Sequence, residues 1–240
     1  MDENPRPRPH LTLRKVVSGG VAVAGAQGLA AVSMKRVATH LGATTMALYR
    51  HVSSKDELLA LMADAVFDTP PDAPQPGEDW RAGLTGWAHA HLAVLREHPW
   101  VLQIAADGPP AMPHQLSWLD RALAAFDRTG LTPPQRLSAV MLVSGYVRNT
   151  ATQEAVILTA ARAQNRTPGE LMTSYQQQLA RLVDPGRLPA LHAVITATDI
   201  SEPHDEFTFG LDRILDGLAD LVVAGPTPAG GSQNVPRDQR

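Results

Sequence analysis

Apolar residues recur along most of this chain at the three- and four-residue spacing of amphipathic helices, and no sustained alternation typical of strands is present. Clusters of proline and glycine interrupt the pattern and separate the helices from one another. The pattern predicts an all-α protein with helices over about 11–26, 33–41, 44–52, 54–67, 78–98, 114–128, 133–164, 168–183, 188–197 and 205–223.

The length and composition are those of a folded globular protein. The 240 residues can form one large domain or two small ones, and 44% of them are hydrophobic while 19% are charged. From the proline-rich boundaries we expect a disordered arm over 1–10, a compact helical unit over 11–68, a larger helical unit over 78–223 and a disordered tail over 224–240.

The sequence contains no cysteine, which excludes disulfide scaffolds and thiolate-bound metals. Its N-terminus lacks the apolar stretch of a secretory signal, and the uncharged stretch at 19–34 is too short and too rich in glycine to span a bilayer. We therefore expect a cytoplasmic protein with no membrane segment.

The net charge of −3 conceals an uneven distribution. Residues 1–55 contain eight basic and two acidic side chains, whereas the rest of the chain contains 13 basic and 22 acidic ones. A basic head on an acidic body predicts that the N-terminal part contacts nucleic acid, and chance clustering of solvated charges is the alternative.

The segment 33–62 carries the clearest functional signal. Ser33 can cap a short helix that buries the small Ala38, and Gly42 follows at a point where a tight turn needs a left-handed backbone. A second short helix begins near Thr44 and exposes small or polar side chains at its N-terminal end. Two short helices joined by such a turn are typical of a helix-turn-helix, whose second helix enters the major groove of DNA.

The helix that follows has an unusual first turn. Ser53 or Ser54 can cap it, Asp56 or Glu57 can close a capping box, and Lys55 then lies in the first turn. A cation is unfavourable at a helix N-terminus, so a neighbouring DNA phosphate explains Lys55 better than the helix itself does.

These motifs resemble the tetracycline-repressor (TetR) family of one-component regulators. The most specific match is the run L-Y-x-H-V-x-x-K-x-x-L over 48–58, and looser similarity continues at Trp80, in REHPW at 96–100 and in FTFGLDRILDGL at 207–218. The resemblance implies a three-helix DNA-binding domain, followed by a larger helical domain for ligand binding and dimerisation. It also implies a homodimeric repressor that a small molecule releases from a near-palindromic operator.

The resemblance assigns eight residues of the N-terminal domain to DNA. Three would hold phosphates, and the others would contact bases or phosphates from the recognition helix and its surroundings. For the tyrosine, a core position that bridges the helices remains an alternative. The phosphate contacts are Tyr49, His51 and Lys55, and the remaining candidates are Lys35, Thr44, Thr45, Ala47 beside a thymine methyl, and Arg50, whose partner is open.

Seven residues of the second unit are candidates for lining a ligand cavity, because they combine apolar bulk with a few polar groups. For each of these residues taken singly, ordinary packing in the core is the favoured alternative, and the histidine and the asparagine are the better ligand candidates because a polar group in an apolar stripe needs a partner. The candidates are Trp87, His91, Met112, Trp118, Met141, Tyr146 and Asn149.

The resemblance also implies that the last long helices pair with a second subunit as a four-helix bundle, and two apolar stripes in the sequence support this. The alternative is that both stripes fill the core of a single chain. The stripes consist of Val140, Val143 and Val147 on the long helix and Phe207, Leu211, Ile214 and Leu218 on the last one.

The sequence departs from the tetracycline repressor at the positions that hold its magnesium–drug chelate. Residues 103–107 contain no histidine, and Pro70 and Pro71 replace another polar position. His89 and His91 point to nearly opposite sides of one helix, so they do not make a metal pair. We therefore expect neither a magnesium–tetracycline ligand nor any other metal or cofactor.

An all-helical enzyme or a protein-binding scaffold is the alternative function. The glycine-rich stretch at 18–28 lacks the order of a dinucleotide fingerprint and follows no strand, so close packing of the first helix explains it better. No phosphate-binding loop, nucleophile elbow or cysteine nucleophile is present. A scaffold explains neither the basic head nor Lys55.

Overall fold

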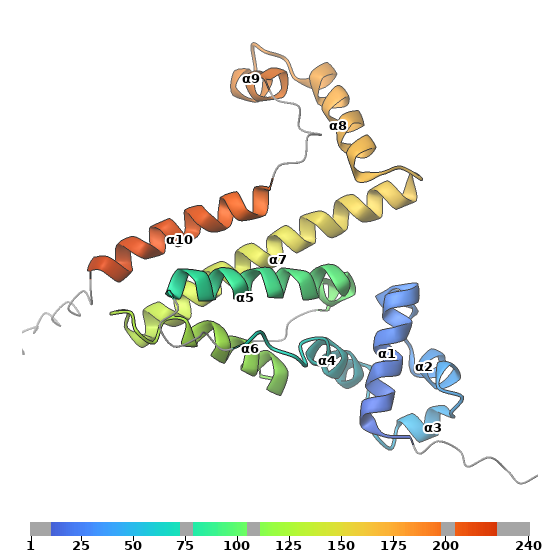
Figure 1. The fold of residues 1–240 in the computed structure, drawn as a ribbon. Helices are drawn as coiled ribbons and strands as arrows, with labels where there is room; N and C mark the ends of the chain where they lie inside the picture. The colour runs from blue at the N-terminus through green and yellow to red at the C-terminus, as the bar shows by residue number, and fades with distance from the viewer. Residues whose placement is uncertain (1–10, 73–78, 105–110, 198–204, 225–240) are drawn as a thin grey trace, which may run out of the picture.

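The computed structural model describes residues 11–72, 79–104, 111–197 and 205–224, and all regular elements in these ranges are helical (Figure 1). The all-α expectation is therefore confirmed. The arm over 1–10 and the tail over 225–240 lie outside the described residues. The N-terminal elements are α1 (Leu13–Gln27), the 3-10 helix η1 (Leu29–Ala31), α2 (Met34–His40), α3 (Thr45–Leu48) and α4 (Lys55–Ala65).

The remaining helices form a larger body that begins at α5. In the body, α5 runs alongside α7, α6 packs against both, and α10 packs against α7 (Figure 1). These elements are α5 (Trp80–Glu97), the 3-10 helix η2 (Pro99–Gln103), α6 (Pro113–Ala124), α7 (Pro133–Ala163), α8 (Pro168–Leu182), α9 (Pro189–Ala197) and α10 (Glu206–Ala224).

Side-chain caps explain why the short N-terminal helices begin where they do. The hydroxyl of Ser33 accepts a hydrogen bond from the amide of Arg36 at 3.2 Å, and that of Thr44 accepts one from Ala47 at 3.2 Å. Such caps satisfy amides that have no partner within a helix. The predicted helix starts are therefore correct to within about two residues.

The glycine-rich stretch of α1 allows close packing on α4, as the sequence predicts. A Cβ atom added at Gly20 would lie 2.5 Å from Sδ of Met62, which is fully buried. A side chain at this position would therefore separate two helices that make up most of the core of the N-terminal domain.

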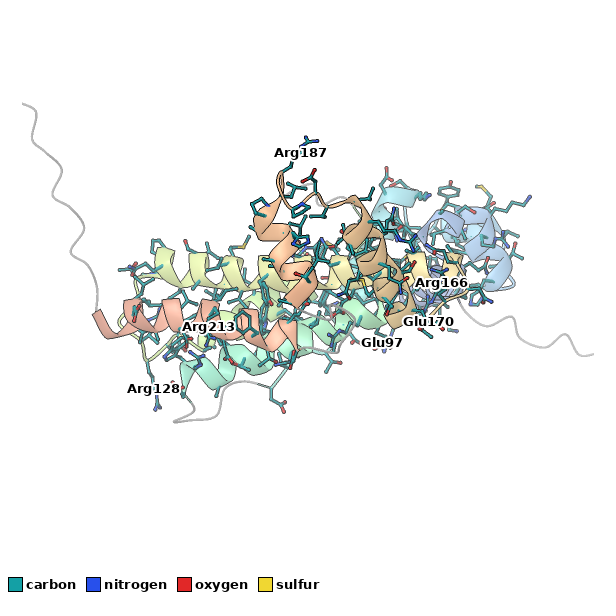
Figure 2. All side chains as sticks on the ribbon, turned by 90° about the horizontal axis from the view of Figure 1, so that it is seen from above. Glu97, Arg128, Arg166, Glu170, Arg187 and Arg213 are labelled. Atoms are coloured by element: carbon teal, nitrogen blue, oxygen red, sulfur yellow. The ribbon has the colours of Figure 1, made fainter. Side chains whose placement is uncertain are left out.

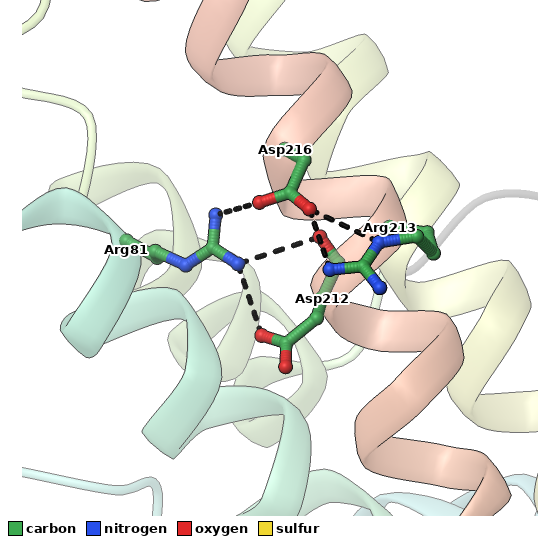
Figure 3. Close-up of polar contacts among 4 residues, drawn as sticks. All are labelled: Arg81, Asp212, Arg213 and Asp216. Carbon is green, nitrogen blue, oxygen red and sulfur yellow. Dashed lines mark hydrogen bonds and ion pairs between the residues drawn. The ribbon is translucent and has the colours of Figure 1, made fainter.

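A group of four charged residues links the start of α5 to α10 (Figure 3). Arg81 lies 2.9 Å from Asp212 and 2.9 Å from Asp216, and Arg213 donates two hydrogen bonds to Asp216. The bonds from Arg213, together with those from Arg81, hold the pKa of the Asp216 carboxyl below its usual value. These carboxylates therefore serve packing at the surface.

The helices α8 and α9 project from the body (Figure 1). They pack on each other, and α8 also packs on the end of α7. Figure 2 shows Arg187, in the turn between them, pointing away from the protein. Several large apolar side chains of this projection are exposed, namely Tyr175, Leu182, Leu188, Leu191 and Val194.

Candidate DNA-binding surface and ligand site

The turn between α2 and α3 has the geometry of a helix-turn-helix. Gly42 adopts φ of 61°, and the amide of Ala43 donates to the carbonyl of Ala38 at 2.9 Å. A positive φ is readily accessible to glycine and strained for most other residues. Gly42 therefore sets the angle at which α3 leaves α2, as the sequence predicts.

The structure brings the eight predicted DNA contacts together at α2, α3 and the start of α4, and none of them is buried. Tyr49 is 49% exposed, so a core role does not explain it. The more exposed members are Lys35, Thr44, Tyr49, Arg50 and Lys55, and the half-buried ones are Thr45, Ala47 and His51.

Met46 also belongs to this surface, although the list of predicted contacts omits it. It lies on α3 with 70% of its surface exposed, which is the greatest exposure among the large apolar side chains of the described residues. A methionine with no core contact at the tip of a recognition helix is suited to apolar contact with a thymine methyl. The sequence signal for Met46 was its place directly after Thr45, at the N-terminal end of the second short helix.

The start of α4 presents a charged side chain on a rigid turn. Ser54 caps α4, and the carboxylate of Glu57 accepts hydrogen bonds from the hydroxyl and amide of Ser53. These bonds lower the pKa of Glu57, the hydroxyl having the larger effect. Lys55 is exposed in the same turn and has no ion pair among the described residues, so its position suits a phosphate.

Four aromatic rings pack against one another where the end of α4 meets α5 and α6. The ring of His91 on α5 lies 4.9 Å from Trp87, 5.5 Å from Phe67 and 5.8 Å from Trp118 on α6. Three of the seven predicted ligand residues, Trp87, His91 and Trp118, are therefore brought together. Phe67, which follows α4, was missed because its sequence context indicated only the end of a helix.

His91 is the polar member of this cluster. Only 8% of the residue is exposed, and Nδ1 has no hydrogen-bond partner among the described residues. Burial, and to a lesser degree the positive charge of Arg148, lowers the pKa of His91 to about 4. The imidazole is therefore neutral at physiological pH.

Hydrogen bonds connect this cluster to the N-terminal helices. The indole of Trp87 donates to the carbonyl of Trp118 at 2.9 Å, and the indole of Trp118 donates to the carbonyl of Phe67 at 2.9 Å. Both tryptophans are buried, so these bonds fix the positions of α5, α6 and the end of α4 relative to one another.

A buried carboxylate joins the same elements. Asp64 on α4 is 4% exposed and accepts hydrogen bonds from the amides of His114 at 3.4 Å and Gln115 at 3.0 Å, in the first turn of α6. Nδ1 of His114 lies 2.9 Å from its Oδ2. An acidic group at a helix N-terminus is stabilised by the helix dipole, so Asp64 holds α6 against α4.

The other predicted ligand residues are not part of this cluster. Met141 is 54% exposed and Asn149 is exposed, so both lie on the surface of α7. Tyr146 stacks on Phe207 at 5.6 Å and donates to the carbonyl of Glu206 at 2.9 Å, which places it against α10. Met112 is half-buried just before α6. Met141, Tyr146 and Asn149 lie apart from the cluster because α7 turns its faces toward different neighbours.

Most of the predicted dimer contacts lie inside the core of the single chain. Neighbouring helices of the same chain cover them, as in the alternative that both stripes fill the core of a single chain. The buried residues are Val140, Val143, Val147, Phe207, Leu211 and Leu218, and Ile214 is half-buried.

An open groove of about 400 Å³ lies between the N-terminal helices and the body. Its walls come from α1, from the end of α4 with the residues that follow it, and from the end of α5. The groove includes Val21, Val66 and Val94 as apolar lining, with Asp68 and Glu97 as its acidic groups. A movement of α4 relative to α5 would change its width.

The described residues contain no cluster of three or more histidine and acidic side chains arranged to hold a metal ion. Within the same ranges, no helix combines the length and the apolar character needed to cross a membrane.

Two family models together cover most of the chain. The family described as "Bacterial regulatory proteins, tetR family" matches residues 16–62, which include α2, α3 and most of α4. The family described as "Tetracyclin repressor-like, C-terminal domain" matches residues 73–222. The first match ends within α4, and the second begins after that helix.

Curated relatives show the same similarity over nearly the full length. The HTH-type transcriptional repressor DrrR1 of Streptomyces coeruleorubidus is 38% identical over 220 residues, which are 90% of this chain and 80% of that protein. The class A tetracycline repressor protein of Escherichia coli is 28% identical and covers 82% of this chain and 86% of its own.

Solved structures share the fold at lower identity. ActR of Streptomyces coelicolor, in complex with actinorhodin, superposes with a TM-score of 0.75 at 24% identity and covers 89% of this chain and 98% of its own. BioQ with its double-stranded DNA operator superposes with a TM-score of 0.59 at 20% identity over 88% and 99% of the two chains.

Proposed function

Because this chain belongs to the TetR family of helix-turn-helix transcriptional regulators, which are not enzymes, we propose that it is a homodimeric repressor. In this proposal the two α3 helices of the dimer bind a near-palindromic operator. A small molecule that binds in the body releases the repressor from the operator. The domain over 11–68 would bind the operator, and the domain over 78–223 would bind the small molecule and the second subunit. One observation carries the proposal. The predicted contact residues of α2, α3 and the start of α4 lie together on a surface rich in cations, and none of these residues is buried.

Base contacts belong to the exposed tip of α3. Thr45 and Met46 lie in the first turn of this helix, where a recognition helix reaches base edges. The hydroxyl of Thr44 accepts the capping hydrogen bond, yet its proton remains free to bond a phosphate oxygen. Met46 and the half-buried Ala47 supply methyl groups for thymine.

Phosphate contacts surround that tip. Tyr49 and Arg50 follow α3, Lys55 begins α4, and Lys35 lies in the first turn of α2. His51 is half-buried beside them, and its imidazole can donate an N–H to a phosphate of the DNA backbone. Such contacts fix the register of the protein on DNA and make binding depend on salt.

Dimerisation through α7 and α10 is supported by their exposed faces. Several large apolar residues on these helices are exposed in the single chain, and exposed apolar surface of this kind marks protein–protein contacts. We infer that a second copy covers it, in place of the buried stripes named from the sequence. The set comprises Leu137, Met141, Leu142, Val156 and Leu158 on α7 and Phe209 and Leu221 on α10.

The cluster around His91 is the proposed site of the effector, because it couples the body to α4 directly. A ligand that displaces Trp118 would act on the carbonyl of Phe67, and through α6 on Asp64. Both residues lie at the end of the helix that carries Lys55. The ligand can release DNA only to the extent that it favours one arrangement of α4 over another.

The test is a fluorescence-anisotropy titration of the duplex upstream of the protein's own coding region, at several salt concentrations. We expect Lys55→Ala to weaken binding about tenfold and to lower the salt slope by about 1 per subunit, because it removes one phosphate contact in each. Thr45→Ala should instead change the preferred bases. Arg166→Ala, which removes an exposed cation beyond the end of α7, should leave both quantities unchanged.

A salt slope of the Lys55→Ala variant equal to that of the wild type would contradict the phosphate assignment. If the wild type bound this duplex and an unrelated one equally well at all salt concentrations, the protein would not recognise an operator there.

A further inference from the structure

The first turn of α1 carries basic side chains and no acidic one. Arg14 and Lys15 are both exposed, and Thr12 caps the helix by accepting a hydrogen bond from the amide of Lys15 at 3.3 Å. Cations are unfavourable at a helix N-terminus, where the amides already carry partial positive charge. As at Lys55, a neighbouring DNA phosphate explains this arrangement better than the helix itself does.

The start of α1 lies at the same end of the N-terminal helices as α3 (Figure 1). Leu11, from which the described chain enters α1, is half-buried and packs against the hydrophobic core. The residues before Leu11 are therefore tethered beside the surface that we assign to DNA.

Two arginines precede this anchor, and the proposed function gives them no role. The sequence over 5–9, which lies outside the described residues, is PRPRP and places Arg6 and Arg8 two residues apart. Both acidic residues of 1–10 come before residue 5, so the positive charge is concentrated in the part nearest α1. Proline restricts the backbone, and a chain with fewer accessible conformations loses less entropy when it is ordered on a partner.

The length of chain between the arginines and the anchor fits the spacing of the DNA grooves. A fully extended chain spans about 3.5 Å per residue, so Arg6 lies within about 17 Å of Leu11. A major groove and the adjoining minor groove are about half a helical turn apart, which is about 17 Å. Both arginines can therefore reach the minor groove beside the bases that α3 contacts.

Arginine is well suited to a minor groove over A·T base pairs. Such a groove is narrow and has an enhanced negative potential that attracts cations into it. The guanidinium group is more weakly hydrated than an ammonium group, so it enters a groove at a lower desolvation cost than lysine does. Homeodomains use the same arrangement, since two arginines on an arm before their first helix occupy the minor groove next to the recognition helix.

We propose that Arg6 and Arg8 enter the minor groove of A·T base pairs that adjoin each half-site of the operator, while Arg14 and Lys15 hold the phosphates at its edge. This inference rests on the proposed function and adds a second element of DNA recognition to α3. A G·C pair places the amino group of guanine in the minor groove, so these positions select against it.

The experiment uses the full-length protein and an operator duplex obtained by selection from a random pool. Three versions of the duplex differ only in the base pairs that adjoin the half-sites, which are A·T, G·C or inosine·cytosine. An inosine·cytosine pair presents the major-groove groups of G·C but lacks the minor-groove amino group, as A·T does. Fluorescence anisotropy should show equal affinity for the A·T and inosine duplexes and at least fivefold weaker binding of the G·C duplex.

Variants separate the minor-groove contacts from the phosphate contacts. The double variant Arg6→Ala, Arg8→Ala should bind all three duplexes equally, and no more tightly than the wild type binds the G·C duplex. The matched control is Arg14→Ala, which should weaken all three duplexes about equally and keep the preference, because phosphate contacts carry no sequence information. Arg166→Ala should behave as the wild type does.

A preference against G·C that survives in the double alanine variant would overturn the proposal, as would equal binding of the three duplexes by the wild type. Weak binding of the inosine duplex would overturn it too, because the adjoining pairs would then be read in the major groove. A fourth duplex with scrambled half-sites identifies failure of the proposed function, which would appear as undiminished affinity for that duplex.

Discussion

Burial determines the behaviour of single residues in this protein, and His91 is the clearest case. Its place in the stripe with Trp87 could be predicted from the four-residue spacing, as could its need for a polar partner. The sequence could not show that Asn149 lies on the surface of α7, because a one-residue shift on a helix changes the direction of a side chain by about 100°. Asp64 was missed for a different reason, because a buried carboxylate and a solvated one cannot be told apart in a sequence.

The low pKa of His91 predicts a loss of stability in acid. The unfolded chain binds a proton at this residue below its ordinary pKa of 6.5, whereas the folded protein resists protonation until about pH 4. Lowering the pH through this window therefore favours unfolding, by on the order of 3 kcal/mol in total. Urea unfolding at pH 7 and pH 4.5 measures the effect.

The His91→Gln variant provides the comparison, because glutamine does not titrate. We expect its free energy of unfolding to fall less than that of the wild type between the two pH values, by about 2–3 kcal/mol. A parallel fall in both proteins would mean that the imidazole is protonated in the folded state.

At the scale of helices, caps and prolines made most boundaries predictable. Pro133 and Pro168 open α7 and α8 at the expected positions, because proline is favoured in the first turn of a helix. The helix expected over 44–52 ends instead at Leu48, and 3-10 helices appear at Leu29–Ala31 and Pro99–Gln103. One or two irregular turns leave too little periodicity to be recognised in a sequence.

The packing of α1 on α4 gives a prediction with an internal control. Gly20→Ala should lower the free energy of unfolding by about 1–3 kcal/mol, because the new methyl group would meet Met62 in a filled space. Gly25→Ala, on the same helix, has nothing within 4 Å of its new Cβ and should raise stability by about 0.5–1 kcal/mol. Chemical unfolding followed by circular dichroism measures both.

If Gly20→Ala were as stable as the wild type, the two helices would not be held as closely as the structure indicates. A Gly20→Ala, Met62→Ala double variant tests the same contact, since removal of the methionine side chain should relieve the crowding while it costs core volume.

At the scale of the whole molecule, the sequence predicted an N-terminal DNA-binding part and a larger helical part, but not the surface that we propose for the contact with a second copy. An amphipathic stripe shows that a face is buried, yet it does not show whether the same chain or another copy covers it. The stripes with Val143 and Leu211 proved to be internal, and the exposed residues of α7 and α10 became visible only in the folded chain.

Substitutions on that exposed face test the dimer without disturbing the core. Met141→Glu and Phe209→Glu, both at positions more than half exposed, should give a folded monomer that binds operator weakly. Leu116→Glu on α6 is the control and should remain a dimer. Sedimentation velocity together with circular dichroism distinguishes a folded monomer from an unfolded chain, and a folded dimer of both variants would place the interface elsewhere.

The central claim is that two copies of the α3 surface read DNA together. Selection of bound sequences from a random pool of duplexes, with the wild-type protein at physiological salt, measures this most directly. The account predicts enrichment of a near-palindrome whose half-sites lie about one helical turn apart, and its loss from a pool selected with the Phe209→Glu variant. Enrichment of one asymmetric half-site by the wild type, or no enrichment at all, would contradict it.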